Sequence, residues 1–360
     1  MNEYNPPRTK TESLKYGGHM SQFAGIRRNI IFDGRARGVE ALDFDNGTGL
    51  KFTVLPDRNM DICSASYKGV PICYVTKNGL SSAANYEAEG AGWLRNFFAG
   101  LLTTCGLSNV GGSCEDIDPE VGKVRFGVHG RINNIGADNV CYEAKWVKED
   151  KFSLEASGRM REAVLNCENL SLTRKIYCEM GKNAIRIHDI VENEGFDSRP
   201  LTILYHINAG YPILCSDSRL ILPTAKIIPA TDNVKGHEDW YNNFDEPAPC
   251  VPEKLFFHEL RKNENGISGS ALVNDKLGLG LYVKFDANAL NRFVQWNKFS
   301  CGDYVVGMEP ANTYAIGRVN MKNAGLLQYI APREKREFDV EIGVLDGAEQ
   351  IAQFEKEMNF

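Results

Sequence analysis

Short runs with an apolar residue at every second position are the feature that most limits what this chain can fold into. Such alternation is typical of β-strands with one buried and one exposed face. Clear examples lie at residues 50–55, 151–156, 172–177, 184–190, 280–285 and 338–344. Turn-forming groups such as Asp45-Asn46-Gly47 and Asn263-Glu264-Asn265-Gly266 separate the runs. Because strands recur without long helices between them, we expect an antiparallel all-β sandwich or barrel rather than a parallel α/β fold.

Segments that favour helix are few. Residues 348–358 suit an amphipathic C-terminal helix, and a short turn is expected at 85–93. No shift in composition, Pro/Ser-rich linker or repeat divides the chain. We therefore expect one continuous β domain over residues 1–360.

Composition and charge exclude several classes of partner. The net charge is −6 and no run of Lys and Arg occurs, which argues against nucleic-acid binding. No stretch approaches the ~20 apolar residues that cross a membrane, and residues 1–8 lack the pattern of an export signal. We therefore expect a cytoplasmic protein, without a membrane or nucleic-acid partner. No Cys-x-x-Cys occurs among the ten cysteines, so we expect reduced, structural thiols.

Two of the six histidines and one glutamate have surroundings that suit acid–base chemistry. His129 lies in Gly127-Val128-His129-Gly130-Arg131, His206 lies in a strand-like run that ends at a turn, and Glu309 lies in an apolar stretch. A histidine exchanges protons near neutral pH, and desolvation makes a carboxylate a stronger base. Each residue also has a structural interpretation. The histidines could be hydrogen-bonded interior groups, and Glu309 could form a buried ion pair with Arg318.

Four further polar residues are candidates for binding hydroxyl groups. Arg58 and Asp61 share a turn at a strand end, Arg131 is adjacent to a candidate histidine, and Asn208 is close to the other. A turn of this kind can direct both side chains into a pocket, but a solvated ion pair is an equally good interpretation. Asn208 could instead fix its own turn. No nucleotide-binding fingerprint is present, so we expect no cofactor.

These stretches resemble the aldose 1-epimerase (galactose mutarotase-like) superfamily, and in particular its branch of unknown function described as "aldose 1-epimerase family protein". The resembling landmarks follow in order along the chain: residues 22–28, 49–62, 100–107, 129–132, 205–212, 309–310 and 317–318. The resemblance implies a large antiparallel β-supersandwich with a sugar cleft on one face. It also implies an enzyme that interconverts sugar anomers without a metal or other cofactor.

The resemblance implies a role for each candidate residue. Glu309 resembles the base that takes the proton of the anomeric hydroxyl, His206 the acid that protonates the ring oxygen, and His129 the group that orients the sugar. As weaker correspondences, the hydroxyl-binding candidates resemble substrate-binding positions: Arg58, Asp61, Arg131 and Asn208.

The motifs also depart from the usual pattern of the superfamily. Gly-Val-His-Gly-Arg replaces the usual Asn-His-x-His-Gly-Gly, and Ile-Asn-Ala-Gly-Tyr replaces a Phe-Asn-Leu segment. A different pocket is therefore expected, and the arginines would suit an acidic or oxidised sugar.

Two other functions are compatible with the same residues. His129, His206 and a carboxylate could bind a divalent metal in a keto-sugar epimerase or lyase. Alternatively, the fold could bind or sense a carbohydrate without turnover. The expected partner in every case is a small sugar, and the sequence leaves open whether the chain is a monomer or a homodimer.

Overall fold

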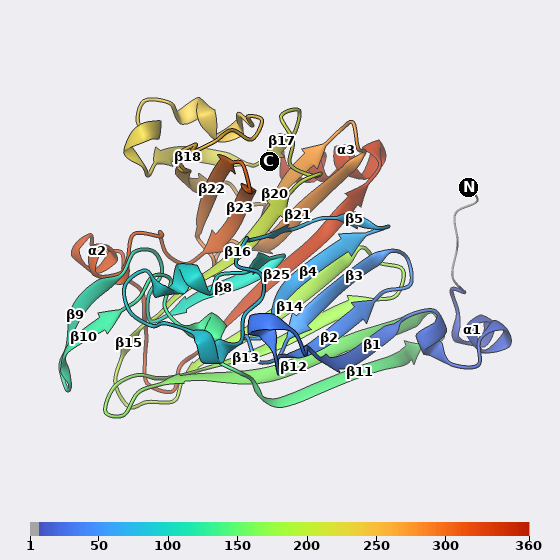
Figure 1. Ribbon diagram of the computed structural model, residues 1–360, viewed down its shortest axis with the longest axis horizontal. Coiled ribbons are helices and arrows are strands. Elements are labelled where there is room, and N and C mark those ends of the chain that lie inside the picture. The colour runs from blue at the N-terminus through green and yellow to red at the C-terminus, as the bar shows by residue number, and fades with distance from the viewer. Residues whose placement is uncertain (1–6, 360) are drawn as a thin grey trace.

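The computed structural model describes residues 7–359 and consists mainly of two large antiparallel sheets (Figure 1). The larger has eleven strands, in the order β1-β2-β3-β4-β8-β16-β23-β22-β19-β18, with β5 paired to β4. The smaller has eight, in the order β11-β12-β13-β14-β25-β21-β20-β17. This arrangement confirms the expected antiparallel all-β class. The expectation that no export signal is present rests mainly on residues 1–6, which lie outside the described residues.

The strand bounds of the larger sheet are β1 (Gly25–Ile30), β2 (Glu40–Asp45), β3 (Leu50–Leu55), β4 (Asp61–Tyr67), β5 (Val70–Pro71), β8 (Leu102–Leu107), β16 (Thr202–Gly210), β18 (Thr224–Pro229), β19 (Lys254–Leu260), β22 (Arg292–Ser300) and β23 (Asp303–Ala311). Those of the smaller sheet are β11 (Asp138–Lys148), β12 (Lys151–Ala163), β13 (Asn169–Glu179), β14 (Ala184–Asn193), β17 (Arg219–Ile221), β20 (Ile267–Asn274), β21 (Leu279–Asp286) and β25 (Lys335–Asp346). Three short pairs complete the strands: β6 (Tyr74–Val75) with β7 (Ala99–Gly100), β9 (Cys114–Asp118) with β10 (Gly122–Phe126), and β15 (Arg199–Pro200) with β24 (Tyr329–Ile330).

Helices are short and peripheral. The α-helices are α1 (Lys10–Tyr16), α2 (Arg318–Asn323) and α3 (Ala348–Met358). The 3-10 turns are η1 (Met20–Gln22), η2 (Gly34–Ala36), η3 (Ala83–Asn85), η4 (Gly92–Arg95), η5 (Ile132–Asn134), η6 (Asp232–Val234) and η7 (Glu238–Asn242). The predicted C-terminal helix is correct, and η3 and η4 flank the turn expected at 85–93. Within residues 7–359, no helix is long and apolar enough to cross a membrane.

Alternating burial explains why the two sheets stack. Along β14 every second residue is buried, as the sequence pattern predicts, and apolar side chains from both sheets form one continuous core. A second apolar layer forms where α3 covers the outer face of the smaller sheet, through Ile351, Phe354 and Met358. The ten cysteines form no disulfide among the described residues, and Cys141, Cys250 and Cys301 are exposed rather than packed in the core.

A buried ion network joins the two sheets inside this core. The guanidinium of Arg174 on β13 binds Asp189 on β14 and Asp61 on β4, with nitrogen–oxygen distances of 2.6 and 2.7 Å. The hydroxyl of Tyr205 on β16 donates to Asp189 at 2.7 Å. All four side chains are fully buried. The network therefore replaces the lost hydration of these charges with direct partners.

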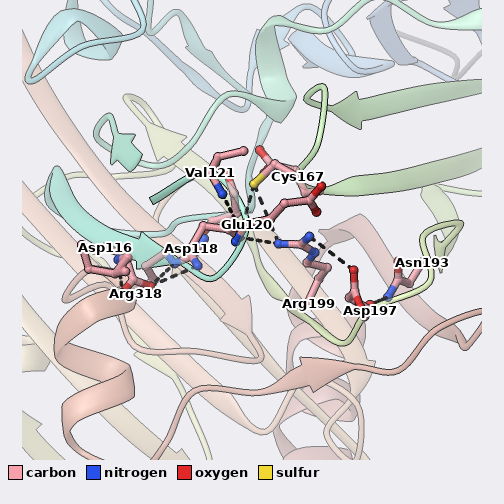
Figure 2. Close-up of polar contacts among 12 residues, drawn as sticks. Asp116, Asp118, Glu120, Val121, Cys167, Asn193, Asp197, Arg199 and Arg318 are labelled. Carbon is pink, nitrogen blue, oxygen red and sulfur yellow. Dashed lines mark hydrogen bonds and ion pairs between the residues drawn. The ribbon is translucent and has the colours of Figure 1, made fainter. Parts of the chain in front are cut away.

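The β9–β10 hairpin is anchored by ion pairs of Asp116 with Arg318 and Lys322 and of Asp118 with Arg199, and Figure 2 shows the two arginine pairs together. The guanidinium of Arg318 lies 3.1 Å from Asp116, and that of Arg199 binds Asp118, which also contacts the Cys167 thiol. These contacts fix the segment that enters β9, and that segment forms one wall of the cavity described next.

Candidate active site

A cavity of about 580 Å³ lies on the outer face of the larger sheet, away from the core between the sheets. His206 on β16 and Glu309 on β23 lie at its closed end, and His129 reaches it from the loop that follows β10. All three side chains therefore line one cavity, although they are distant in sequence. A volume of this size is typical of small-molecule sites.

His206 and Glu309 meet because their strands are neighbours in the sheet. β16 pairs directly with β23, with Asn208 opposite Gly307. His206 Nε2 lies 3.2 Å from Glu309 Oε1, and both side chains are at least nine-tenths buried. The two atoms are not aligned as a hydrogen bond. Within the described chain, Glu309 Oε1 and His206 Nδ1 have no hydrogen-bond partner. The pair therefore keeps capacity to bind a polar ligand.

Gly307 makes room for the Glu309 carboxyl. A Cβ atom at this position would lie 2.2 Å from Glu309 Oε1, which is far inside van der Waals contact. The carboxyl group therefore folds back along β23 over the glycine. Glycine is required here for the space that it leaves and not for its backbone freedom, because Gly307 lies in a regular strand.

His129 is held by a reciprocal contact with Gly111. The backbone N–H of His129 donates to the carbonyl of Gly111 at 2.9 Å, and the N–H of Gly111 points at His129 Nδ1 at 3.4 Å. Since Nδ1 accepts, a neutral ring carries its proton on Nε2. The backbone of His129 has a φ of 55°, a conformation uncommon for a residue with a side chain. Its ring packs on Trp93 at 4.7 Å and lies edge-on to His206 at 6.2 Å.

Burial favours the neutral form of every ionisable group at this end of the cavity. Desolvation, with a contribution from Glu253, raises the pKa of Glu309 well above its usual value. Desolvation and the proximity of His129 lower the pKa of His206 to about 3, against an opposing effect of Asn208. Desolvation lowers the pKa of His129 to about 4. Without ligand, burial therefore favours a neutral imidazole on His206 and a protonated carboxyl on Glu309.

Arg58 and Asp61 do not line the cavity, which corrects the expectation that they bind substrate hydroxyls. The turn between β3 and β4 directs both side chains inward, and both are fully buried. Arg58 donates to the backbone carbonyls of Ser81, Asn96 and Asn133. Burial lowers the pKa of Arg58 to about 10 and raises that of Asp61 to about 6. Asp61 belongs to the Arg174 network beneath the sheet.

Arg131 and Asn208 also lie outside the lining of the cavity. Arg131 turns to the far side of the His129 loop, where its guanidinium lies 3.0 Å from Glu168 and 3.6 Å from Glu162. Asn208 is fully buried, and its amide donates to the His206 carbonyl at 2.8 Å. These positions suit residues that hold the histidines in place. The suggested ion pair between Glu309 and Arg318 is wrong, because Arg318 binds Asp116 (Figure 2).

Aromatic and charged side chains that the sequence did not single out complete the cavity. Trp93, Phe97 and Trp296 surround His206, with ring centroids of Phe97 and Trp296 at 5.2 and 5.5 Å from the imidazole. Alternation along β22 was the available signal, since it places Trp296 and Lys298 on one face. The other charged groups of the cavity wall are Lys77, Glu253 and Asp303. Residues 7–359 contain no group of three or more His, Cys, Asp or Glu side chains placed to share a metal ion.

A family model described as "Domain of unknown function (DUF4432)" matches residues 36–344. No curated protein sequence matches the chain.

Solved structures are similar to this chain over most of its length. A candidate aldose 1-epimerase from Klebsiella pneumoniae has a TM-score of 0.82 at 21% identity, covering 92% of this chain and 86% of that one. A galactose mutarotase-like protein from Clostridium acetobutylicum has a TM-score of 0.62 at 16% identity, over 90% and 99%. Galactose 1-epimerase from Lactobacillus acidophilus has a TM-score of 0.58 at 12% identity, over 90% and 99%. At these identities the likeness establishes the galactose mutarotase-like fold, as the sequence landmarks implied.

Proposed function

This chain belongs to the DUF4432 family, and from that premise we propose that it is an aldose 1-epimerase, which interconverts the two anomers of a sugar. The observation that carries the proposal is the buried contact between Glu309 and His206 at the closed end of an aromatic cavity. Anomer exchange needs one group to take a proton and another to give one, and this pair joins a carboxyl that burial keeps protonated to an imidazole that burial keeps neutral.

The proposed reaction leaves the total number of protons on Glu309 and His206 unchanged. On binding, the sugar places its anomeric hydroxyl at Glu309 and its ring oxygen at His206, and hydrogen bonds to the sugar stabilise the ionised pair. Glu309 then takes the hydroxyl proton while His206 donates to the ring oxygen, and the C1–O5 bond breaks. The open aldehyde rotates about C1–C2, and closure on its other face reverses both transfers. Positioning and general acid–base catalysis each lower the barrier.

His129 has the orienting role in this proposal. Its Nε2–H is free to donate to a sugar oxygen, because Nδ1 faces Gly111. The lowered pKa of His129 keeps the ring neutral at pH 7, so it stabilises the sugar as a hydrogen-bond donor without a full charge. Trp296, which is partly exposed in the cavity, offers an apolar face for the carbon–hydrogen surface of a sugar ring.

The variant Glu309→Gln tests the assignment of the base. It keeps the shape of the side chain but cannot accept the hydroxyl proton, so we expect nearly complete loss of anomer exchange in a folded protein. Two-dimensional exchange NMR on a panel of aldoses measures the rate, and circular dichroism checks folding. Glu259→Gln on β19, outside the cavity and beside Lys226, is the matched control.

Three results would contradict the proposal. Unchanged exchange in Glu309→Gln would refute the base assignment. Stoichiometric metal in the purified protein, with activity lost on chelation, would favour the metal-dependent alternative. Sugar binding without faster exchange in the wild-type protein would favour a binding or sensing role.

A further inference from the structure

The side chains of β22 that line the cavity lead away from the acid–base pair. Trp296 is opposite Gly307, the residue beneath the Glu309 carboxyl. Lys298 lies two residues further along the same face, a step of roughly 7 Å in a strand. Trp296 and Lys298 are both half-buried, whereas Glu309 is almost fully buried. Lys298 therefore lies toward the open end, one strand step beyond the tryptophan that flanks the reacting groups.

Lys298 differs from neighbouring lysines in its partners. Its ammonium donates to the backbone carbonyl of Val251 at 2.7 Å, and no ion pair of the described chain includes it. Lys77, on the same cavity wall, is paired with Asp303 at 2.7 Å, and Lys254 on β19 is paired with Asp245 at 3.0 Å. A lysine that is partly withdrawn from water is usually paired with an acid. Lys298 thus has two N–H donors left for a ligand.

The other charges of the cavity wall cancel Lys298 only in part. Asp303 accepts from Lys77 and from the hydroxyl of Tyr74 at 3.0 Å. Against desolvation, these contacts and the charges of Lys77 and Lys298 lower the pKa of Asp303, so the two lysines share this carboxylate. Glu253 accepts from the indole N–H of Trp296 at 3.0 Å and is exposed, where solvent and salt screen its charge. Lys298 is less exposed than Glu253, so solvent screens the charge of Lys298 less.

Building on the proposed function, we propose that the substrate is a sugar with an anionic substituent remote from the anomeric carbon, and that Lys298 binds this substituent. C1 would lie at Glu309 and His206, the ring against Trp296, and the anionic group at Lys298. The sequence suggested an acidic sugar because of its arginines, but the structure places Arg58 and Arg131 elsewhere. The residue proposed to bind the anionic group is therefore a lysine on β22, not an arginine.

The test compares galactose, galacturonate and galactose 6-phosphate as probes. Exchange NMR gives kcat/KM for each, and quenching of tryptophan fluorescence gives affinity, since Trp93 and Trp296 line the cavity. We expect the wild-type protein to favour at least one anionic sugar over galactose by roughly tenfold or more, as a charge-assisted hydrogen bond allows. Salt should reduce this preference. In Lys298→Met the preference should fall toward unity, while Lys298→Arg should keep most of it.

Lys226→Met is the matched control, because Lys226 lies on the same sheet, outside the cavity, and its preference ratio should equal that of the wild type. Equal kcat/KM for neutral and anionic sugars, or a preference that persists in Lys298→Met, would overturn the inference. A preference for the phosphate alone supports it and identifies the anionic group. If no sugar is exchanged faster but galacturonate affinity falls about tenfold in Lys298→Met, this inference holds and the proposed catalytic function fails.

Discussion

Replacing Gly307 by alanine should impair catalysis while leaving the fold intact. The added Cβ would lie 2.2 Å from Glu309 Oε1 and 3.2 Å from the Cβ of Trp296. To reach an ordinary van der Waals separation the carboxyl oxygen must move by about 1 Å. Glu309 is 2% exposed, so the surrounding side chains limit how it can move. The carboxyl group would then leave the position that it occupies beside His206.

The expected loss follows from that displacement. A misplacement of about 1 Å in a reacting group can cost about 100-fold in rate, which corresponds to about 2.7 kcal/mol of activation free energy. The free energy of unfolding should change little, because alanine is favoured over glycine in a strand by roughly 0.5–1 kcal/mol, which offsets part of the crowding. Gly307→Ala should therefore lower kcat far more than it lowers stability.

Exchange NMR on the best substrate and urea unfolding provide the two measurements. Gly136→Ala is the control, because the nearest atom to a Cβ there is 3.7 Å away and the residue lies outside the cavity. A Gly307→Ala protein that keeps kcat within twofold of the wild type would refute the argument that the carboxyl position over Gly307 is the reactive one.

Two further predictions concern the histidines. Asn109 is fully buried, and its amide accepts from the N–H of Arg318 at 2.8 Å and donates to the carbonyls of Gly127 and Gly112 at 2.8 and 3.1 Å. Asn109→Ala should therefore cost about 1–3 kcal/mol in urea unfolding and should lower kcat by loosening the segment that fixes His129; unchanged values of both would contradict this. The rate should also form a plateau in pH. It should fall below about pH 4, where His206 and His129 gain protons, and fall again at higher pH, where Glu309 loses its proton. A rate that rises with pH around 6.5, the ordinary histidine value, would show that the histidines are not buried as described.

Alternation carried most of the information on the fold. The runs at 172–177 and 184–190 became β13 and β14, because their apolar residues can be buried only on one face of a sheet. The helix at 348–358 was equally predictable from the spacing of its apolar residues. The order of the strands could not be predicted from the sequence. β16 lies between β8 and β23, and each of these two strands is about a hundred residues away from β16 along the chain.

The candidate site was only partly predictable for the same reason. His129, His206 and Glu309 stood out by residue type and surroundings, and the fold brings them to one cavity. Arg58 and Asp61 looked similar in sequence, but the direction of a turn decides whether polar side chains meet solvent or core. Residues such as Trp296 and Lys298 carry no local signal that separates a cavity wall from any other strand face.

The Arg174 network has a consequence for how this protein can diversify. It ties Tyr205, the residue before His206, to the opposite sheet through Asp189. Strand β16, which carries His206, is thus bonded to the opposite sheet. The amide hydrogens of β16 should therefore be among the slowest to exchange with deuterium. The outer walls are built largely from loops, and the ion pairs that hold them lie outside the core between the sheets. New sugar preferences can therefore arise by substitutions in the cavity walls, while the strands that carry His206 and Glu309 keep their positions.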